Sequence, residues 1–193
     1  KLGVEFDARF GHEVLNDLLG EGVDAQQGAT RYSSLVDMHK KGDTDLLLLN
    51  GGVSKTTSVG ANEGGQFSVY QSDRHGFNNP DSEWDSSKVE WLVIGDSFAH
   101  GITVQPGDDI AGQIRSITKS TTINLGVGGL GPLVEIAILK EYAEALQPKN
   151  VLWLYYEGND FKELLDEKGV PILMQYLQDN FSQNLIDNQE EID

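Results

Sequence analysis

The sequence predicts an α/β domain with a parallel sheet and a helix layer on each face, in a three-layer α/β/α arrangement. Three apolar segments, 89–95, 121–125 and 151–156, have strand length, and each ends in glycine or polar residues. Helical patterns follow each of them after short loops. Such alternation implies parallel pairing through right-handed crossovers, with the carboxyl ends of all three strands at one edge of the sheet.

The remaining elements follow from periodicity and from helix-ending residues. Ile110, Ile114 and Ile117 recur on one side of a helical segment, and Pro132 stands where a first helical residue belongs. The expected elements are helices over 109–118, 133–146, 161–168 and 171–181, followed by a frayed acidic tail over 187–193.

Residues 1–87 are expected to form an α+β extension packed on the domain formed by 88–193. The extension is expected to hold a helix over 8–19, a short strand or loop over 22–29 and a second helix over 33–41. An apolar run over 45–50, a loop over 54–65 and an edge strand or hairpin arm over 66–71 should follow. The segment 72–80 is dense in turn formers, and we interpret it as a surface turn without direct chemistry.

Composition excludes several classes of function. With 31 acidic against 14 basic residues, the formal net charge of −17 disfavours nucleic acid and anionic membranes as partners. The chain has no cysteine, so no thiolate chemistry is available, and no metal-ligand spacing indicates a metal or cofactor. No segment reaches the roughly 20 apolar residues that membrane insertion requires. The first residue is Lys1, which indicates a trimmed N-terminus.

The three strand ends carry the residue types that acyl transfer needs. They hold Ser97, the glycine-rich run 126–131 and Asn159. A hydroxyl supplies the nucleophile, while backbone N–H groups and a neutral side-chain amide supply donors for an oxyanion. These residues therefore predict a serine hydrolase site at the sheet edge.

The same residues resemble the sequence blocks of the SGNH (GDSL-type) hydrolases, in order and in spacing. The resemblance covers about residues 73–160 and is carried by Gly95-Asp96-Ser97, by the run 124–129 and by Gly158-Asn159-Asp160. It implies a flavodoxin-like sheet, Ser97 as the nucleophile, Asn159 as an oxyanion donor and Gly129 as a backbone donor, with Gly128 as the alternative. Gly95, Asp96 and Asp160 would support them, Asp96 by fixing the turn.

The resemblance also implies a reaction and a setting. It predicts hydrolysis or transfer of an O-acyl group, chiefly acetyl, on a small-molecule or carbohydrate ester. The lead-in 72–80 resembles a segment of bacterial members tied to surface polysaccharides, which favours an extracytoplasmic or cell-envelope location. The sequence indicates no oligomeric state.

One family feature has no counterpart in the sequence. The family supplies its base from an Asp-x-x-His block near the C-terminus, but the histidines here stand at positions 12, 39, 75 and 100. We expect that the C-terminal part of the domain, with its further strands, lies outside these residues. The alternatives are a pseudo-enzyme and a relocated base, for which His100 and His75 are the candidates.

Two rival functions remain. Gly126, Gly128 and Gly131 fit a dinucleotide fingerprint between a strand and a helix, with Glu157 at the next strand end. A non-catalytic carbohydrate-binding module is the other rival, because exposed aromatic rings can stack on sugars. The aromatic candidates are Trp84, Trp91, Trp153, Tyr155 and Tyr156, of which Trp91 and Trp153 are expected to pack in the core.

Overall fold

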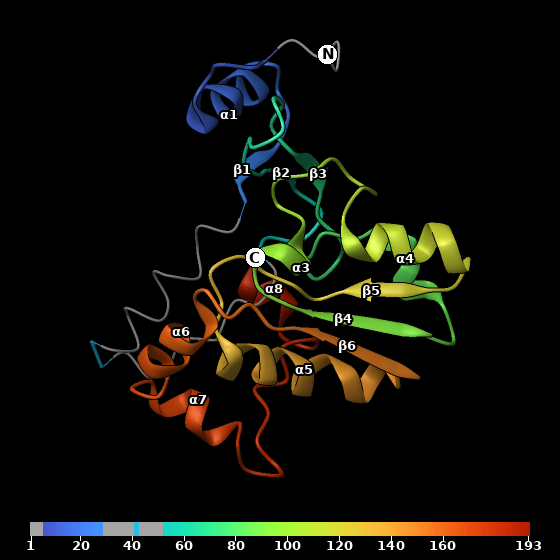
Figure 1. The fold of residues 1–193 in the computed structure, drawn as a ribbon, viewed down its shortest axis with the longest axis vertical. Coiled ribbons are helices and arrows are strands. Elements are labelled where there is room, and N and C mark those ends of the chain that lie inside the picture. The colour runs from blue at the N-terminus through green and yellow to red at the C-terminus, as the bar shows by residue number, and fades with distance from the viewer. Residues whose placement is uncertain (1–5, 29–40, 43–51) are drawn as a thin grey trace.

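The structure, a computed structural model, describes residues 6–28, 41–42 and 52–193. It shows a mixed α/β protein with two three-stranded sheets (Figure 1). The larger sheet is parallel and has the order β5–β4–β6. Its strands are β4 (Trp91–Gly95), β5 (Thr122–Asn124) and β6 (Asn150–Leu154). The α/β class and the three parallel strands are thus confirmed at the predicted places.

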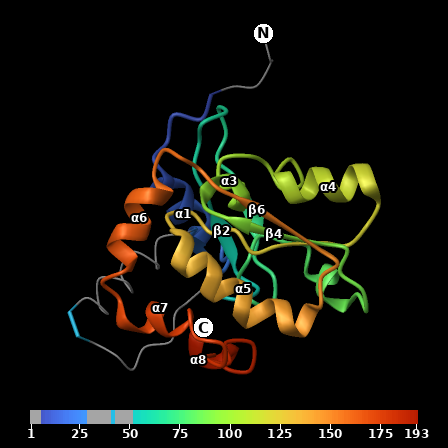
Figure 2. The same ribbon diagram turned by 60° about the horizontal axis from the view of Figure 1, so that its bottom comes forward.

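Helices lie on both sides of this sheet. Figure 1 shows α3 (Ser97–His100) and α4 (Ile110–Thr118) on one side and α5 (Pro132–Leu146) on the other. Figure 2 shows the later helices on the side of α5, and α6 and α7 contact it directly. These helices are α6 (Asp160–Glu167), α7 (Pro171–Gln175) and α8 (Gln189–Ile192). The predicted helix over 171–181 is therefore shorter than expected.

Strand β4 is buried on both faces, which explains its unbroken apolar sequence. Leu92 and Ile94 point into the larger core cluster with α5, while Val93 packs with Ala99 and Ala111 beneath α3 and α4. This alternation is the period of two that a strand imposes. Burial on both faces fixes the register of β4, and with it the position of the turn that follows.

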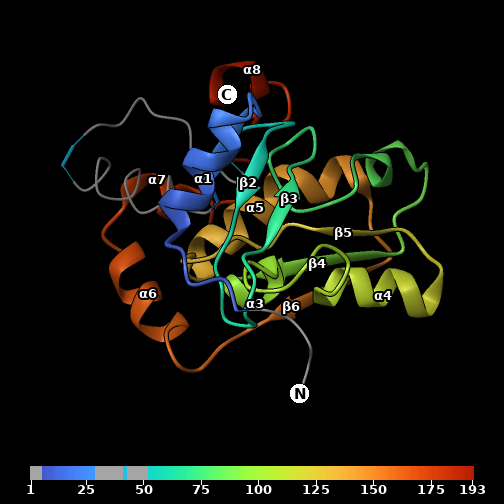
Figure 3. The ribbon, with the colours of Figure 1, turned by 90° about the horizontal axis from the view of Figure 1, so that it is seen from above.

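The extension holds the second sheet and a helix. Its elements are α1 (Gly11–Gly20), β1 (Ala25–Gln27), β2 (Thr57–Val59), β3 (Val69–Gln71) and the 3₁₀ helix η1 (Asp81–Asp85). β2 pairs parallel with β1 and antiparallel with β3, and both β2 and β3 run across the direction of β4 and β5 (Figure 3).

The predictions for the extension hold in part. The helix over 8–19 and the edge strand over 66–71 are confirmed by α1 and β3. The loop predicted over 54–65 is wrong where it contains β2, because three residues are too few to show a strand period. The predicted helix over 33–41 and the apolar run over 45–50 lie outside the described residues, apart from Lys41.

The segment 72–80 is buried, so its interpretation as a surface turn is wrong. Asp73 accepts hydrogen bonds from the backbone of His75 and Phe77 and from the side chains of Asn79 and Trp84. Burial raises the pKa of Asp73 to about 6, against these hydrogen bonds. The turn-forming residues therefore build a buried turn held by internal hydrogen bonds, and not a solvated loop.

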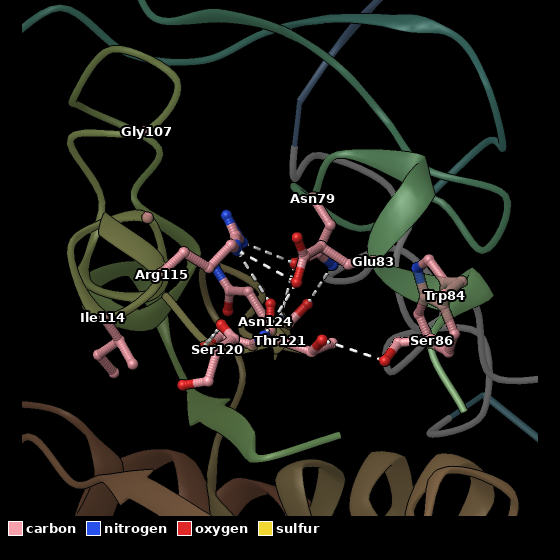
Figure 4. A network of polar contacts seen from close by, with 12 residues as sticks. Asn79, Glu83, Trp84, Ser86, Gly107, Ile114, Arg115, Ser120, Thr121 and Asn124 are labelled. Atoms are coloured by element: carbon pink, nitrogen blue, oxygen red, sulfur yellow. Dashed lines mark hydrogen bonds and ion pairs between the residues drawn. The ribbon is translucent and has the colours of Figure 1, made fainter. Parts of the chain in front are cut away.

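This turn also closes one edge of the larger sheet (Figure 4). The Asn79 side chain accepts from the Asn124 N–H and donates to the Asn124 carbonyl, each at 2.8 Å. Glu83 accepts from the Thr122 N–H at 2.9 Å, and Arg115 donates to the Thr122 carbonyl at 3.0 Å. Side chains thus replace the missing neighbouring strand along the outer edge of β5.

The acidic tail is not frayed. It forms α8, Ile192 is buried in the core, and Asp193 accepts hydrogen bonds from the backbone and the hydroxyl of Ser54. In the described ranges, none of the helices has the length and apolarity needed to cross a membrane.

Candidate active site

Ser97 stands at the end of the central strand, as its sequence position predicts. β4 ends at Gly95, where a Cβ would come within 2.7 Å of the Leu154 carbonyl oxygen on β6. Asp96 then caps α3 by accepting from the Phe98 N–H at 3.0 Å, and Ser97 is the first residue of that helix. The Ser97 side chain is half-buried, and its hydroxyl has no hydrogen-bond partner among the residues that the structure describes.

The second strand end packs directly against the first. Asn124 donates from Nδ2 to the Ala99 carbonyl at 2.7 Å, and the Val127 N–H donates to the Gly95 carbonyl at 3.2 Å. At Gly126, a Cβ would lie 2.4 Å from the Ala99 side chain. Glycine is therefore required here because the two backbones touch.

The glycine run 126–131, which we call the donor loop, offers different groups at its two central positions. The Gly128 N–H donates to His100 Nδ1 at 3.1 Å, so it is already occupied. Gly129 is exposed and has a left-handed backbone with φ of 80°. Its N–H has no hydrogen bond within the described part of the chain. Of the two glycines left open by the sequence, Gly129 is the one with a free donor.

Asn159 joins the third strand end to the first. It is the N-cap residue of α6, and its Nδ2 donates to Glu163 Oε1 at 2.9 Å and to Asp96 Oδ2 at 3.4 Å. The second contact is long, so one of the two Nδ2 hydrogens is only weakly engaged. Asp160, the next residue, accepts from the Tyr156 N–H at 2.6 Å and holds the start of the helix.

Neither candidate histidine is placed to act as a base on Ser97. His100 uses both ring nitrogens, Nδ1 with Gly128 and Nε2 with the Tyr70 hydroxyl at 2.7 Å. Burial lowers its pKa to about 4. His75 lies at a different place, with its ring against Trp84 and Tyr142 and its Nδ1 3.2 Å from Gln189 Oε1.

Five carboxylic acids gather along α6 and at the amino end of α5, around Asn159. We call this group the carboxylate cluster. Its members are Asp96, Glu135, Asp160, Glu163 and Glu167.

The carboxylate cluster contains carboxyl groups that hold protons at neutral pH. Burial raises the pKa of Glu135 to about 8 and that of Glu167 to about 7, and neighbouring carboxylates add to both shifts. The pKa values of Asp160 and Glu163 are raised by the same causes. In the described residues, no group of three or more acids and histidines has the arrangement of a metal site.

The amino end of α5 is occupied, which weakens the dinucleotide interpretation. The Gly131 and Leu133 N–H groups donate to the Glu167 carboxylate at 2.7 and 2.9 Å. Pro132 has no N–H, and the Val134 N–H bonds within the turn. A pyrophosphate would need these same donors and would meet the negative carboxylate cluster. Glu157, which the dinucleotide interpretation places at the next strand end, is exposed.

Aromatic residues beside the site are exposed more than the sequence suggests. Trp153 is 43% exposed, so the prediction that it packs in the core is wrong, because in the described part of the chain no strand pairs with the outer side of β6. Tyr155 and Tyr156 are also exposed, and the Tyr156 ring packs at a tilt against the ring of Phe98, which follows Ser97. Trp84 instead packs against the core and donates to Asp73.

Sequence reasoning missed the residues that support the site. The sequence indicates His100 only as a candidate base, and Glu163 and Glu167 only as residues of the predicted helix over 161–168. Glu163 stands four residues after Asn159, a spacing that places two side chains on one face of a helix. That spacing was a usable signal for Glu163, whereas the contact of Glu167 with α5 has no local signature.

Comparisons with known proteins give no family assignment. A scan against protein-family models finds no match, and searches of curated proteins and of solved structures find none either. The resemblance to SGNH hydrolases therefore depends on the three sequence blocks alone.

Proposed function

We propose that this chain carries the nucleophile and oxyanion donors of an SGNH-type serine ester hydrolase or acyl transferase, with the corresponding three-layer fold. The substrate class is an O-acyl ester, chiefly acetyl, of a carbohydrate. The observation that supports the proposal is the set of contacts between strand ends, from Asn159 to Asp96 and from Gly128 to His100, on the two sides of Ser97.

Each group has a role in that reaction. The Ser97 hydroxyl attacks the acyl carbon and forms an acyl-serine, while the alcohol leaves. The N–H groups of Ser97 and Gly129 and the weakly held Nδ2 hydrogen of Asn159 would hold the oxyanion. Asp96 keeps the turn in shape through its cap on α3.

The reaction also requires a general base for the Ser97 proton. His100 has both nitrogens engaged and His75 lies elsewhere, so neither fits that role. We propose that the base comes from outside the described residues, as the Asp-x-x-His block does in the family.

Acylation of Ser97 tests the proposal without requiring fast turnover. The protein is incubated with p-nitrophenyl acetate, and peptide mass spectrometry locates the acetyl group. We expect acetyl on Ser97 and its loss in Ser97→Ala. Ser87→Ala, at an exposed serine, is the matched control and should leave the labelling unchanged. Labelling spread over surface lysines, unaffected by Ser97→Ala, would contradict the proposed nucleophile.

Asn159 gives a second test. In a form of the protein that has esterase activity, Asn159→Ala removes one oxyanion donor. Such a loss typically lowers kcat by about 10²–10³, while KM changes less. Asn159→Asp is a poorer test because it adds a carboxylate against Asp96 and Glu163 and so also lowers stability. Steady-state kinetics of the alanine variant check the prediction, and an unchanged kcat would remove Asn159 from the site.

A non-catalytic carbohydrate-binding role is the second candidate, favoured by the exposed rings of Trp153, Tyr155 and Tyr156. Stacking on these rings would predict quenching of tryptophan fluorescence by acetylated oligosaccharides, in wild type and Ser97→Ala alike. Binding that persists without any Ser97 acylation would favour this candidate over the hydrolase.

A further inference from the structure

His100 is a buried ionisable group three residues after the candidate nucleophile, and it has no role in the reaction proposed above. Its side chain is fully enclosed, and three polar contacts surround it. The ring contacts Gly128 and Tyr70, and the His100 carbonyl accepts from Asn78 Nδ2 at 3.0 Å. A buried imidazole with every polar atom satisfied is held in one orientation.

The donors and acceptors around the ring determine its protonation state. The Gly128 N–H can only donate, so His100 Nδ1 must be the unprotonated nitrogen. The neutral ring then carries its hydrogen on Nε2 and donates it to the Tyr70 hydroxyl. Tyr70 itself lies on β3 of the second, smaller sheet. One directed series of hydrogen bonds thus runs from the donor loop to the small sheet.

This series connects two regions that are far apart in the sequence. The donor loop follows β5 of the larger sheet, whereas Tyr70 lies on β3 of the extension. Figure 1 shows α3, which carries His100, between the two regions. A second contact supports the same connection, because the Ala61 N–H donates to the Ile102 carbonyl at 2.8 Å just after α3.

We infer that His100 is a positioning residue that fixes the donor loop by holding the Gly128 N–H, with Tyr70 of the extension setting the orientation of its ring. The extension is then part of the active-site scaffold and not only a neighbour of it. The catalytic meaning of this inference depends on the proposed function, because Gly129, the candidate oxyanion donor, directly follows the residue that His100 holds.

The hydrogen bond itself is tested by NMR on the full chain, independently of activity. The chain has four histidines, so ring ¹⁵N signals can be assigned by single substitutions. We expect the neutral Nε2–H form for His100 at pH 7 and a scalar coupling across the hydrogen bond between Gly128 ¹⁵N and His100 Nδ1. An Nδ1–H ring, or a Gly128 amide that exchanges freely with solvent, would overturn the inference.

Three variants and one control separate the two ring contacts. In His100→Asn, the side-chain oxygen can take the place of Nδ1 and keep Gly128. His100→Gln reaches the place of Nε2, towards Tyr70, and releases Gly128. Tyr70→Phe removes only the orienting hydroxyl. His12→Asn is the matched control, because His12 is an exposed histidine on α1.

We expect slow amide exchange at Gly128 in wild type, His12→Asn and His100→Asn, intermediate exchange in Tyr70→Phe, and fast exchange in His100→Gln. A merely structural role would instead make exchange follow the melting temperatures, with His100→Asn and His100→Gln alike, and this would overturn the inference.

In an active form, loss of the Gly128 contact should lower kcat roughly 10- to 100-fold with little change in KM, because small displacements of a donor affect the transition state most. His100→Asn should recover most of that loss and His100→Gln should not. Equal kcat values for the two variants would overturn the positioning role. Failure of the proposed function is seen separately, as an absence of Ser97 acylation while the NMR coupling persists.

Discussion

The two edges of the larger sheet differ in how their backbone is satisfied. On β5, the outward N–H and carbonyl groups of Thr122 and Asn124 all bond to side chains of Asn79, Glu83 and Arg115. On β6, Asn150 donates to Glu90 beside β4, so alternation directs the backbone groups of Val151 and Trp153 to the other side. In the part of the chain that the structure describes, no strand pairs with that side.

The difference extends to the loops that follow the two strands. The donor loop after β5 is held by a neutral histidine with matched donors and acceptors. The carboxylate cluster lies around the helix that follows β6, with members from α5 and from the turn after β4, and together with Asn159 it contains four of the five buried side-chain atoms that have no hydrogen-bond partner in the described residues. Those four are Glu135 Oε1, Asn159 Oδ1, Asp160 Oδ1 and Glu163 Oε2. In the described residues, the buried polar side chains on the β5 side of the site all have hydrogen-bond partners, whereas several on the β6 side have an atom without one.

Removing the Asn79 side chain should give the largest effect. Asn79→Ala leaves the buried N–H and carbonyl of Asn124 without partners and removes one of the two hydrogen bonds that Asp73 Oδ2 accepts, the other coming from Trp84. We expect the free energy of unfolding to fall by about 3 kcal/mol, since each unsatisfied buried group costs about 1–3 kcal/mol. Urea denaturation measures it, with the exposed Asn180→Ala as control. A loss below about 1 kcal/mol would show that the β5 edge does not depend on side-chain closure.

Because the pKa values in the carboxylate cluster are raised, we expect the free energy of unfolding to fall as the pH rises. The pKa of Glu135 is raised from 4.5 to about 8, so between these values the folded state keeps a proton that the unfolded chain has released. The free energy of unfolding should then fall by up to about 1.4 kcal/mol per pH unit in that window and level off above about pH 8. Glu135→Gln should reduce this slope.

Thermal unfolding between pH 5 and pH 9 measures the slope. Glu144→Gln is the matched control, because Glu144 lies on the same helix and is exposed. If Glu135→Gln and Glu144→Gln have the same pH profile as wild type, Glu135 is not a proton-holding group in the folded protein.

The open β6 edge should tolerate a charge, which is the smallest effect expected. Val151 is 46% exposed, so Val151→Lys should change the free energy of unfolding by no more than about 0.5 kcal/mol. It should also reduce self-association in light scattering at high concentration, because lysine on an exposed edge opposes strand pairing. Ile117→Lys, on the exposed side of α4, controls for the added charge alone. Destabilisation beyond about 1 kcal/mol would mean that this edge is covered in solution.

The sequence predicts the repetitive parts of this molecule and misses those made by distant contacts. The strands β4, β5 and β6 and the helices α4 and α5 have clear apolar periods, and all lie within a few residues of their predicted bounds. The positions of Ser97, Gly129 and Asn159 follow from the predicted ends of these strands. The closure of β5 was not predictable, because Asn79 and Asn124 are 45 residues apart and neither has a periodic neighbour.

Misplaced predictions share a second cause, which is local polarity. The segment 72–80 and the tail 187–193 contain the residue types of surface loops, yet Asp73, Asn79 and Ile192 are buried. Polar residues can be buried when their hydrogen bonds are satisfied, and those partners are supplied by tertiary structure. For the site, the sequence predicts Ser97 and Asn159 at strand ends along one edge of the sheet. The four-residue spacing indicates the contact of Asn159 with Glu163, but no local pattern indicates its contact with Asp96.

The position of β4 in the larger sheet has a consequence for biosynthesis. β4 is synthesised before both of its neighbours, and its second partner, β6, begins 59 residues later in the chain, at Asn150 against Trp91. Strand pairing across such separations is slow, because the intervening loop must close first. Until β6 has left the ribosome, one edge of the apolar strand β4 has no neighbouring strand. This is the stage of synthesis at which the nascent chain would most need a chaperone.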